Sequence, residues 1–121
     1  MGTQISTHEV KKYLVRIKTA ISEGRYQFIQ RRKNMESLSK VGLLVDHVKE
    51  ILLGLTYSDY FNGPEPEDDE DYEPGEYLFF GCDVHENEFF VKFKLEQLID
   101  NEKCICLSFH IAEKKIYYPY K

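Results

Sequence analysis

The chain has 121 residues, of which 42% are hydrophobic and 14% aromatic, enough for the core of one compact domain. No apolar run approaches the ~20 residues that cross a bilayer, and the N-terminus lacks the basic-then-apolar pattern of a secretion signal. We therefore expect a cytoplasmic protein with no membrane partner. The net charge of −5 argues against a nucleic-acid partner only if it is spread evenly along the chain, which it is not.

An amphipathic helix is predicted near the N-terminus. Ser6 and Glu9 have the spacing of a capping box, in which the two residues satisfy the first free N–H groups of a helix. Gly24 then marks the end of the helical pattern. The apolar residues that recur at helical spacing between these points are Val10, Leu14, Ile17 and Ile21.

Three shorter elements follow this helix. Residues 25–29 predict a short edge strand, a second helix begins near Asn34 as its cap and runs to Gly42, and a third begins near Asp46 and extends to Leu55. Residues 56–64 are typical of a turn. The acidic stretch that follows has too little apolar content to order itself and is predicted to be a loop.

Three strands complete the chain, at about residues 76–84, 88–95 and 103–111. A short aromatic tail ends it. Helices followed by an antiparallel sheet indicate an α+β fold, in which N-terminal helices pack on one face of a small antiparallel β-sheet. We expect a single domain over residues 1–121, with an acidic loop at about 64–75.

The last two strands alternate their side chains with period two. The pattern assigns Phe89, Val91, Phe93, Ile105, Leu107 and Phe109 to one face, and Lys92, Lys94, Ser108 and His110 to the other. Cations beside a titratable imidazole suit chemistry on an anion such as a phosphodiester, and a solvated sheet face is the plainer interpretation. A one-residue bulge would break this assignment.

Metal and cofactor sites are not indicated. The three cysteines, Cys82, Cys104 and Cys106, are odd in number and lie on predicted strands, which is typical of ordinary thiols in a reducing compartment. No histidine pair has the spacing of a zinc protease, and no glycine loop has the spacing that binds a nucleotide phosphate. We therefore expect no metal and no cofactor.

Charge is distributed very unevenly along the sequence. Without the seven carboxylates of residues 65–73 the net charge of −5 becomes +2, and the first forty residues carry nine Lys or Arg against three Glu. A basic patch of this size could hold phosphates or an acidic partner, and solvated helix faces give similar counts. The acidic loop is interpreted as a solvated connector or, alternatively, as a tethered mimic of phosphate that lowers non-specific RNA binding.

The order of several short motifs is familiar. These are Arg31-Arg-Lys-Asn34, Leu38 to Gly42-Leu43, Leu55-Thr-x-x-Asp59-Tyr60, Asn62-Gly-Pro64, Leu107-Ser-Phe-His110 and Tyr118-Pro119. In this order the chain resembles the MqsR-like toxins of type II toxin–antitoxin systems, within the RelE-type group of small ribonucleases. The resemblance extends from about Val10 to the end of the chain.

This resemblance implies a metal-independent mRNA endoribonuclease, or interferase, that inhibits translation and growth and is silenced by a cognate antitoxin protein. The RNA 2′-hydroxyl attacks the adjacent phosphate and leaves a 2′,3′-cyclic phosphate. Such chemistry needs a general acid or base near neutrality and cations against the charged transition state. Partners would be mRNA and the antitoxin, with no DNA binding by the chain alone.

The candidate residues follow from this chemistry. His110 is the predicted general acid or base, with Lys92 and Lys94 as phosphate binders. Tyr77 joins this catalytic set because family members place a tyrosine before their sheet. The predicted RNA-binding residues are Arg31, Arg32, Lys33 and Tyr118. The plainer alternatives are solvent-facing lysines, edge or tail aromatics, and arginines that pair with the acidic loop. Asp59 is predicted to be a cap or turn residue.

The sequence also departs from the family. Its best-known members carry lysine where this chain has Asn62 and His110, and a basic, aromatic segment in place of the acidic loop. A second hypothesis is therefore a non-catalytic RNA- or protein-binding module of the same fold.

Overall fold

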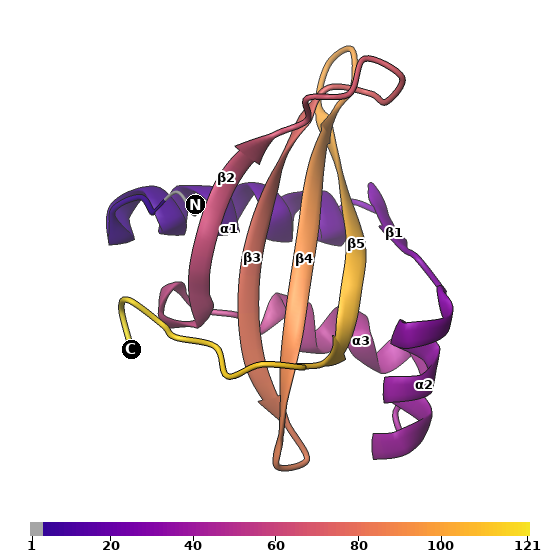
Figure 1. Cartoon of the computed structure of the whole chain (residues 1–121). Helices are drawn as coiled ribbons and strands as arrows, with labels where there is room; N and C mark the ends of the chain where they lie inside the picture. The colour runs from indigo at the N-terminus through magenta and orange to yellow at the C-terminus, as the bar shows by residue number, and fades with distance from the viewer. Residues whose placement is uncertain (1–3) are drawn as a thin grey trace.

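The computed structural model describes residues 4–121, which form an α+β fold of three α-helices and one open five-stranded sheet (Figure 1). The sheet has the strand order β1-β5-β4-β3-β2, and it is antiparallel except where β1 pairs with β5. The elements are α1 Thr7–Ser22, β1 Tyr26–Phe28, α2 Arg32–Val41, α3 Val45–Leu53, a 3-10 turn η1 Tyr57–Asp59, β2 Tyr60–Pro66, β3 Gly75–Val84, β4 Asn87–Gln97 and β5 Glu102–Ile111.

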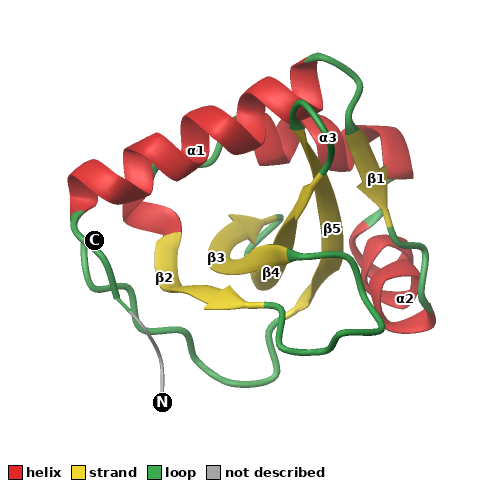
Figure 2. Ribbon diagram, turned by 90° about the horizontal axis from the view of Figure 1, so that it is seen from above, coloured by secondary structure: helices red, strands yellow, loops and turns green. Residues whose placement is uncertain are grey.

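The predicted α+β fold is confirmed, but only two of the three α-helices within residues 4–121 cover a face of the sheet. Helices α1 and α3 run behind the sheet, whereas α2 packs against β5 beside the short edge strand β1 (Figures 1 and 2). Apolar residues of the helices and of one sheet face form the core, with Ile17, Leu52, Phe80 and Phe93 among its fully buried members. We call the opposite face of the sheet the open face. No helix within residues 4–121 is long and apolar enough to cross a membrane.

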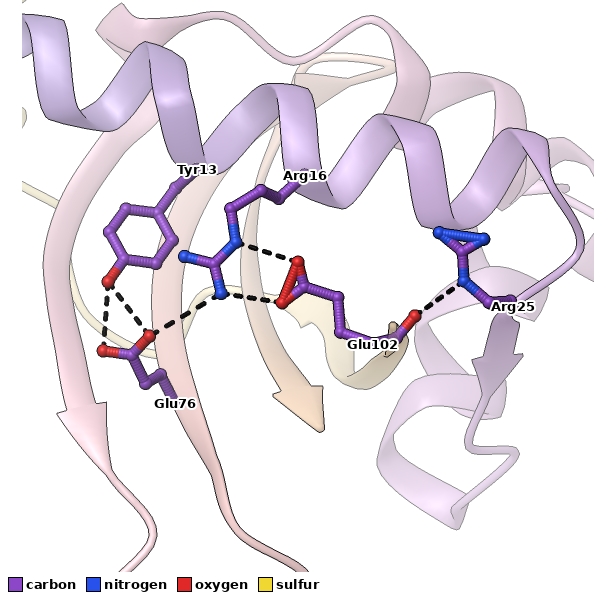
Figure 3. A network of polar contacts seen from close by, with 5 residues as sticks. All are labelled: Tyr13, Arg16, Arg25, Glu76 and Glu102. Atoms are coloured by element: carbon purple, nitrogen blue, oxygen red, sulfur yellow. Dashed lines mark hydrogen bonds and ion pairs between the residues drawn. The ribbon is translucent and has the colours of Figure 1, made fainter. Parts of the chain in front are cut away.

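Helix α1 forms as its sequence predicts. The Ser6 side chain accepts a hydrogen bond from the Glu9 backbone N–H, so the predicted cap is confirmed. A polar network fastens the helix to the sheet (Figure 3). Arg16 binds both carboxylate oxygens of Glu102 at 2.8 and 2.7 Å, and this pairing lowers the pKa of Glu102. The Tyr13 hydroxyl donates to Glu76 at 3.0 Å.

Two predictions about local structure are wrong. Residues 60–66 form strand β2 instead of a turn and loop, because they pair with β3 through an irregular register that contains Asn62, Gly63 and Pro64. A strand with such an irregular register shows no regular alternation of apolar and polar residues in its sequence. Asn34 does not cap α2. Arg31 occupies the cap position, and Asn34 is a fully buried residue within the helix.

A β-bulge in β5 corrects the predicted sheet faces. Lys92 pairs with Ser108, but the next residue, Phe93, pairs with Cys106, so Leu107 is the extra residue. Cys104 and Cys106 therefore face the core, whereas Ile105, predicted for the apolar face, lies opposite Lys94 on the open face. After the bulge, side chains point to the faces that the sequence pattern predicts. Ser108 and His110 therefore share the open face with Lys92 and Lys94.

The C-terminal tail, residues 112–121, crosses the open face in front of β4 and β3 (Figure 1). Glu88 fixes it by accepting from the Ile116 N–H at 3.2 Å and from the Tyr118 hydroxyl at 3.0 Å. Gly81 lies directly beneath, where an added Cβ would meet the Tyr118 hydroxyl at 2.2 Å. The glycine thus lets the tail lie close against the sheet.

Candidate functional site

The open face brings together all four predicted catalytic residues. Register places Tyr77 opposite Lys94, Lys92 opposite Ser108, and His110 opposite Phe90, all on adjacent strands. Directly opposite and diagonal residues on one sheet face lie within reach of each other's side chains. The strands thus carry one imidazole, two ammonium groups and one phenol along a single surface.

Lys92 is the least constrained cation of this set. Its ammonium nitrogen lies 4.7 Å from the ring centroid of Tyr77 and 5.5 Å from that of Phe79. Cation–π contacts hold the ammonium group over the sheet without neutralising its charge. No carboxylate within residues 4–121 forms an ion pair with Lys92. Its charge is therefore available to an anion.

Arg31 adds a second cation from outside the sheet. It ends the segment between β1 and α2, and its guanidinium donates a hydrogen bond to the Ser108 hydroxyl. Because Ser108 lies opposite Lys92, the guanidinium reaches the same part of the open face. The predicted pairing of Arg31 or Arg32 with the acidic loop is not what the structure contains, since Arg32 pairs with Glu36 one helical turn away.

Lys94 and Tyr77 are bound by the acidic loop. The Glu67 carboxylate accepts hydrogen bonds from the Tyr77 hydroxyl and, at 2.9 Å, from the Lys94 ammonium. Only 6% of the Lys94 side chain and 9% of the Glu67 side chain are exposed. The hydrogen bond from Tyr77 and the contact with Lys94 lower the pKa of Glu67 to about 2, while burial and Glu67 raise that of Tyr77 to about 12.

His110 lies on the open face, away from the helices. Its Nδ1 is 3.0 Å from the Ile111 carbonyl oxygen, which can only accept, so Nδ1 carries a proton and Nε2 is the free base of the neutral ring. The imidazole stacks on Phe90 with ring centroids 5.3 Å apart. Although its exposed fraction is 6%, the side chain lines a groove that opens to solvent.

This groove has a volume of about 470 Å³ and a mostly apolar lining. Phe61, Phe90 and His110 form its sheet side, and the tail residues Ala112–Tyr117 form the other. We call it the His110 groove. Phe61 and Phe90 were not among the residues singled out from the sequence. The alternation of Phe90 with Lys92 on one strand was the signal that could have found Phe90.

The two remaining predicted RNA-binding residues, Lys33 and Tyr118, both contact the C-terminal tail or its partners. Lys33 on α2 binds both carboxylate oxygens of Glu113 at 3.1 Å, which places it at the tail side of the groove. Tyr118 packs against Phe61 and bonds Glu88, so its phenol serves the tail. Asp59 accepts from the Thr56 N–H at 2.8 Å, which confirms the predicted capping role.

The cysteines are packed thiols. Cys104 and Cys106 are buried in the core, and burial raises the pKa of Cys104 to about 12, so the thiolate is scarce at neutral pH. Residues 4–121 contain no cluster of three or more His, Cys, Asp or Glu side chains that could hold a metal ion.

No family model, curated protein or solved structure matches this chain.

Proposed function

We propose that this protein is a metal-independent endoribonuclease of the MqsR-like, RelE-type group, acting as the toxin of a toxin–antitoxin pair. The observation that carries the proposal is the position of His110. Its imidazole has a free Nε2 and lines an open groove. The same sheet face holds the guanidinium of Arg31 and the ammonium of Lys92, which forms no ion pair within residues 4–121. The order of motifs in the sequence supports RNA cleavage as the reaction. The α+β fold agrees with the fold class that the resemblance implies.

The reaction uses these groups in ordinary roles. The 2′-hydroxyl oxygen attacks the adjacent phosphorus and loses its proton, and the 5′-oxygen of the next nucleotide leaves and gains one, which yields a 2′,3′-cyclic phosphate. His110 acts as the base or the acid, because its Nε2 accepts a proton in the neutral ring and donates it in the cation. Lys92 and Arg31 stabilise the charge that develops on the phosphate oxygens.

The test is induced expression in a bacterial host, comparing wild type with His110→Ala. We expect growth arrest with new 5′ ends in cellular mRNA for the wild type, and loss of both in the variant. The purified variant should cleave an oligoribonucleotide about 10²- to 10⁴-fold more slowly in the presence of EDTA. His8→Ala is the matched control, since His8 is exposed on α1. Soluble, folded wild-type protein that produces neither effect would contradict the proposal.

One observation favours a non-catalytic binding module as the second candidate. Glu67 engages Lys94 and Tyr77, two of the four residues predicted to act in catalysis. In a module of this kind the open face would bind RNA or protein without cleaving it. The two candidates separate if wild-type protein binds an oligoribonucleotide and leaves it intact, since the endoribonuclease would cut it under the same conditions.

A further inference from the structure

The His110 groove is formed by chain segments that are far apart in the sequence. The chain leaves β5 at Ile111 and is fixed again at Ile116, whose N–H is bound by Glu88. Between these two points it arches over the sheet, with residues 113–115 exposed. The hollow beneath the arch faces Phe61 of β2 and Phe90 of β4. The same tail that crosses the open face therefore builds one wall of the groove.

The lining has two chemically distinct parts. On the sheet side the rings of Phe61 and Phe90 lie 6.0 Å apart between centroids, and His110 stacks on Phe90. On the tail side the exposed Lys114 and Lys115 line the groove. Glu113 on this side is paired with Lys33. Neither Lys114 nor Lys115 forms an ion pair within residues 4–121, and the Lys115 ammonium lies 5.9 Å from the ring centroid of Tyr117.

We propose that the His110 groove binds one unpaired nucleobase of single-stranded RNA, with Lys114 and Lys115 holding the adjacent phosphate. Aromatic side walls stack bases, which all have a π-face, and cations at the entrance follow the backbone. A volume of about 470 Å³ lies within the range of small-ligand sites. The charge of the entrance favours a nucleotide over an apolar protein side chain, which would gain nothing from the two lysines.

This inference deepens the proposed function, because a base held here places its own ribose beside His110. The groove would thereby choose which 2′-hydroxyl meets the imidazole. Binding in the groove is nevertheless separable from cleavage, since stacking needs Phe61 and Phe90 but no proton transfer.

The experiment measures equilibrium binding of an RNA that cannot be cut. The probe is a 5′-fluorescein hexanucleotide with 2′-O-methyl groups, which blocks the attacking oxygen, and its affinity is followed by fluorescence anisotropy. Phe61→Leu removes a groove ring and keeps an apolar side chain. We expect it to weaken binding roughly 5- to 100-fold, the range for losing one stacked base. Phe28→Leu is the control, because Phe28 of β1 packs against the core and does not line the groove.

A probe of the same length whose sugars carry no bases tests the stacking directly. It should bind wild type and Phe61→Leu equally, since it offers phosphates alone. Equal affinity of wild type, Phe61→Leu and Phe28→Leu for the base-containing probe would overturn the inference. So would chemical shift changes in wild-type protein, on adding the probe, that avoid His110 and residues 112–117. This second measurement covers the case in which Phe61→Leu fails to fold.

The outcomes also separate this inference from the proposed function. Groove binding without cleavage of natural RNA would retain the groove and reject the endoribonuclease. If cleavage were lost in His110→Ala, while Phe61→Leu left both cleavage and probe affinity unchanged, the endoribonuclease would be retained and base binding in the groove rejected.

Discussion

Asn34 determines which way His110 faces. Its side chain is fully buried, donates to the carbonyl oxygens of Ile29 at 2.8 Å and Leu107 at 3.0 Å, and accepts from the Phe109 N–H at 3.0 Å. Leu107 is the bulged residue of β5. One amide therefore binds backbone groups on both sides of the bulge, the Leu107 carbonyl and the Phe109 N–H, and ties them to the segment before α2. Without the bulge, Phe89 would oppose His110 and the imidazole would face the core.

We predict that Asn34→Ala lowers both stability and cleavage. Three buried backbone groups lose their partner, and since each such loss costs about 1–3 kcal/mol, the free energy of unfolding should fall by at least about 2 kcal/mol. The measurement is urea unfolding followed by circular dichroism, together with the cleavage rate at a temperature where the variant is folded. Cleavage should fall because the bulge no longer holds His110 on the open face.

The control for this prediction is Leu38→Ala on the same helix. Leu38 is 2% exposed, and truncation of a buried leucine costs about 2–5 kcal/mol without touching the bulge. If the two variants were equally unstable and retained equal cleavage rates while folded, Asn34 would be a structural residue only.

At the scale of elements, the acidic loop is attached to the sheet by a single carboxylate. Glu67 lies on Lys94 and Tyr77, and the Glu73 carbonyl oxygen accepts from the same ammonium at 2.7 Å. Asp68 and Glu70 are exposed and form no ion pair among residues 4–121. Much of the loop is thus solvated, and Glu67 is the loop carboxylate that binds Lys94 and Tyr77 on the open face.

This attachment should depend on pH in a defined direction. The pKa of Glu67 is lowered from 4.5 to about 2, so the ionised form is favoured by folding. Its contribution to stability is complete above pH 4.5 and is lost as the pH falls through about 2. We expect its side-chain carboxyl carbon to titrate by NMR with a midpoint near 2. Tyr77→Phe should raise that midpoint, because the Tyr77 hydrogen bond is the largest cause of the shift.

A wild-type midpoint near 4.5 would show that the carboxylate is free in solution and that the loop does not rest on the open face. An unchanged midpoint in Tyr77→Phe would assign the attachment to Lys94 alone.

Sequence patterns predict a helix or strand well where the spacing of apolar residues stays regular along the element. Helix α1 and strands β3 and β4 each extend over ten residues or more without a bulge between β3 and β4, and their existence and type were predicted, as were those of β5 despite its bulge. Strand β2 was missed because its register shifts twice within seven residues. The bulge at Leu107 was not predictable for a related reason: it is stabilised by Asn34, 73 residues away, which no local pattern reports.

The candidate site was predictable in its strand residues only. His110, Lys92 and Lys94 share a face as their alternation predicted. The sequence contains no sign that Glu67 neutralises Lys94 or that the tail closes a groove over Phe90, since both depend on how loops fold back on the sheet. Contacts of this kind are set by tertiary packing, and the periodicity of strands carries no information about them.

At the scale of the whole molecule, the proposed function requires RNA to bind on the open face of the sheet. The helices cover the other face, and the exposed residues of α1 there include Lys11 and Lys12. A net charge of −5 opposes RNA at long range, so binding depends on a local cation cluster rather than on the overall field. Lysines on the two faces should therefore contribute very differently to affinity, although each carries the same charge.

We predict that Lys92→Glu weakens RNA binding and Lys12→Glu does not. Both substitutions change the net charge from −5 to −7, and they alter different faces. Lys92 lies beside Tyr77 without an ion pair, so its loss removes one phosphate contact, and the slope of log affinity against log salt should flatten by about 0.7. The measurement is anisotropy of a labelled, uncleavable oligoribonucleotide at four salt concentrations. Equal weakening and equal slopes for the two variants would place RNA on no particular face, and a larger effect of Lys12→Glu would move it to the helices.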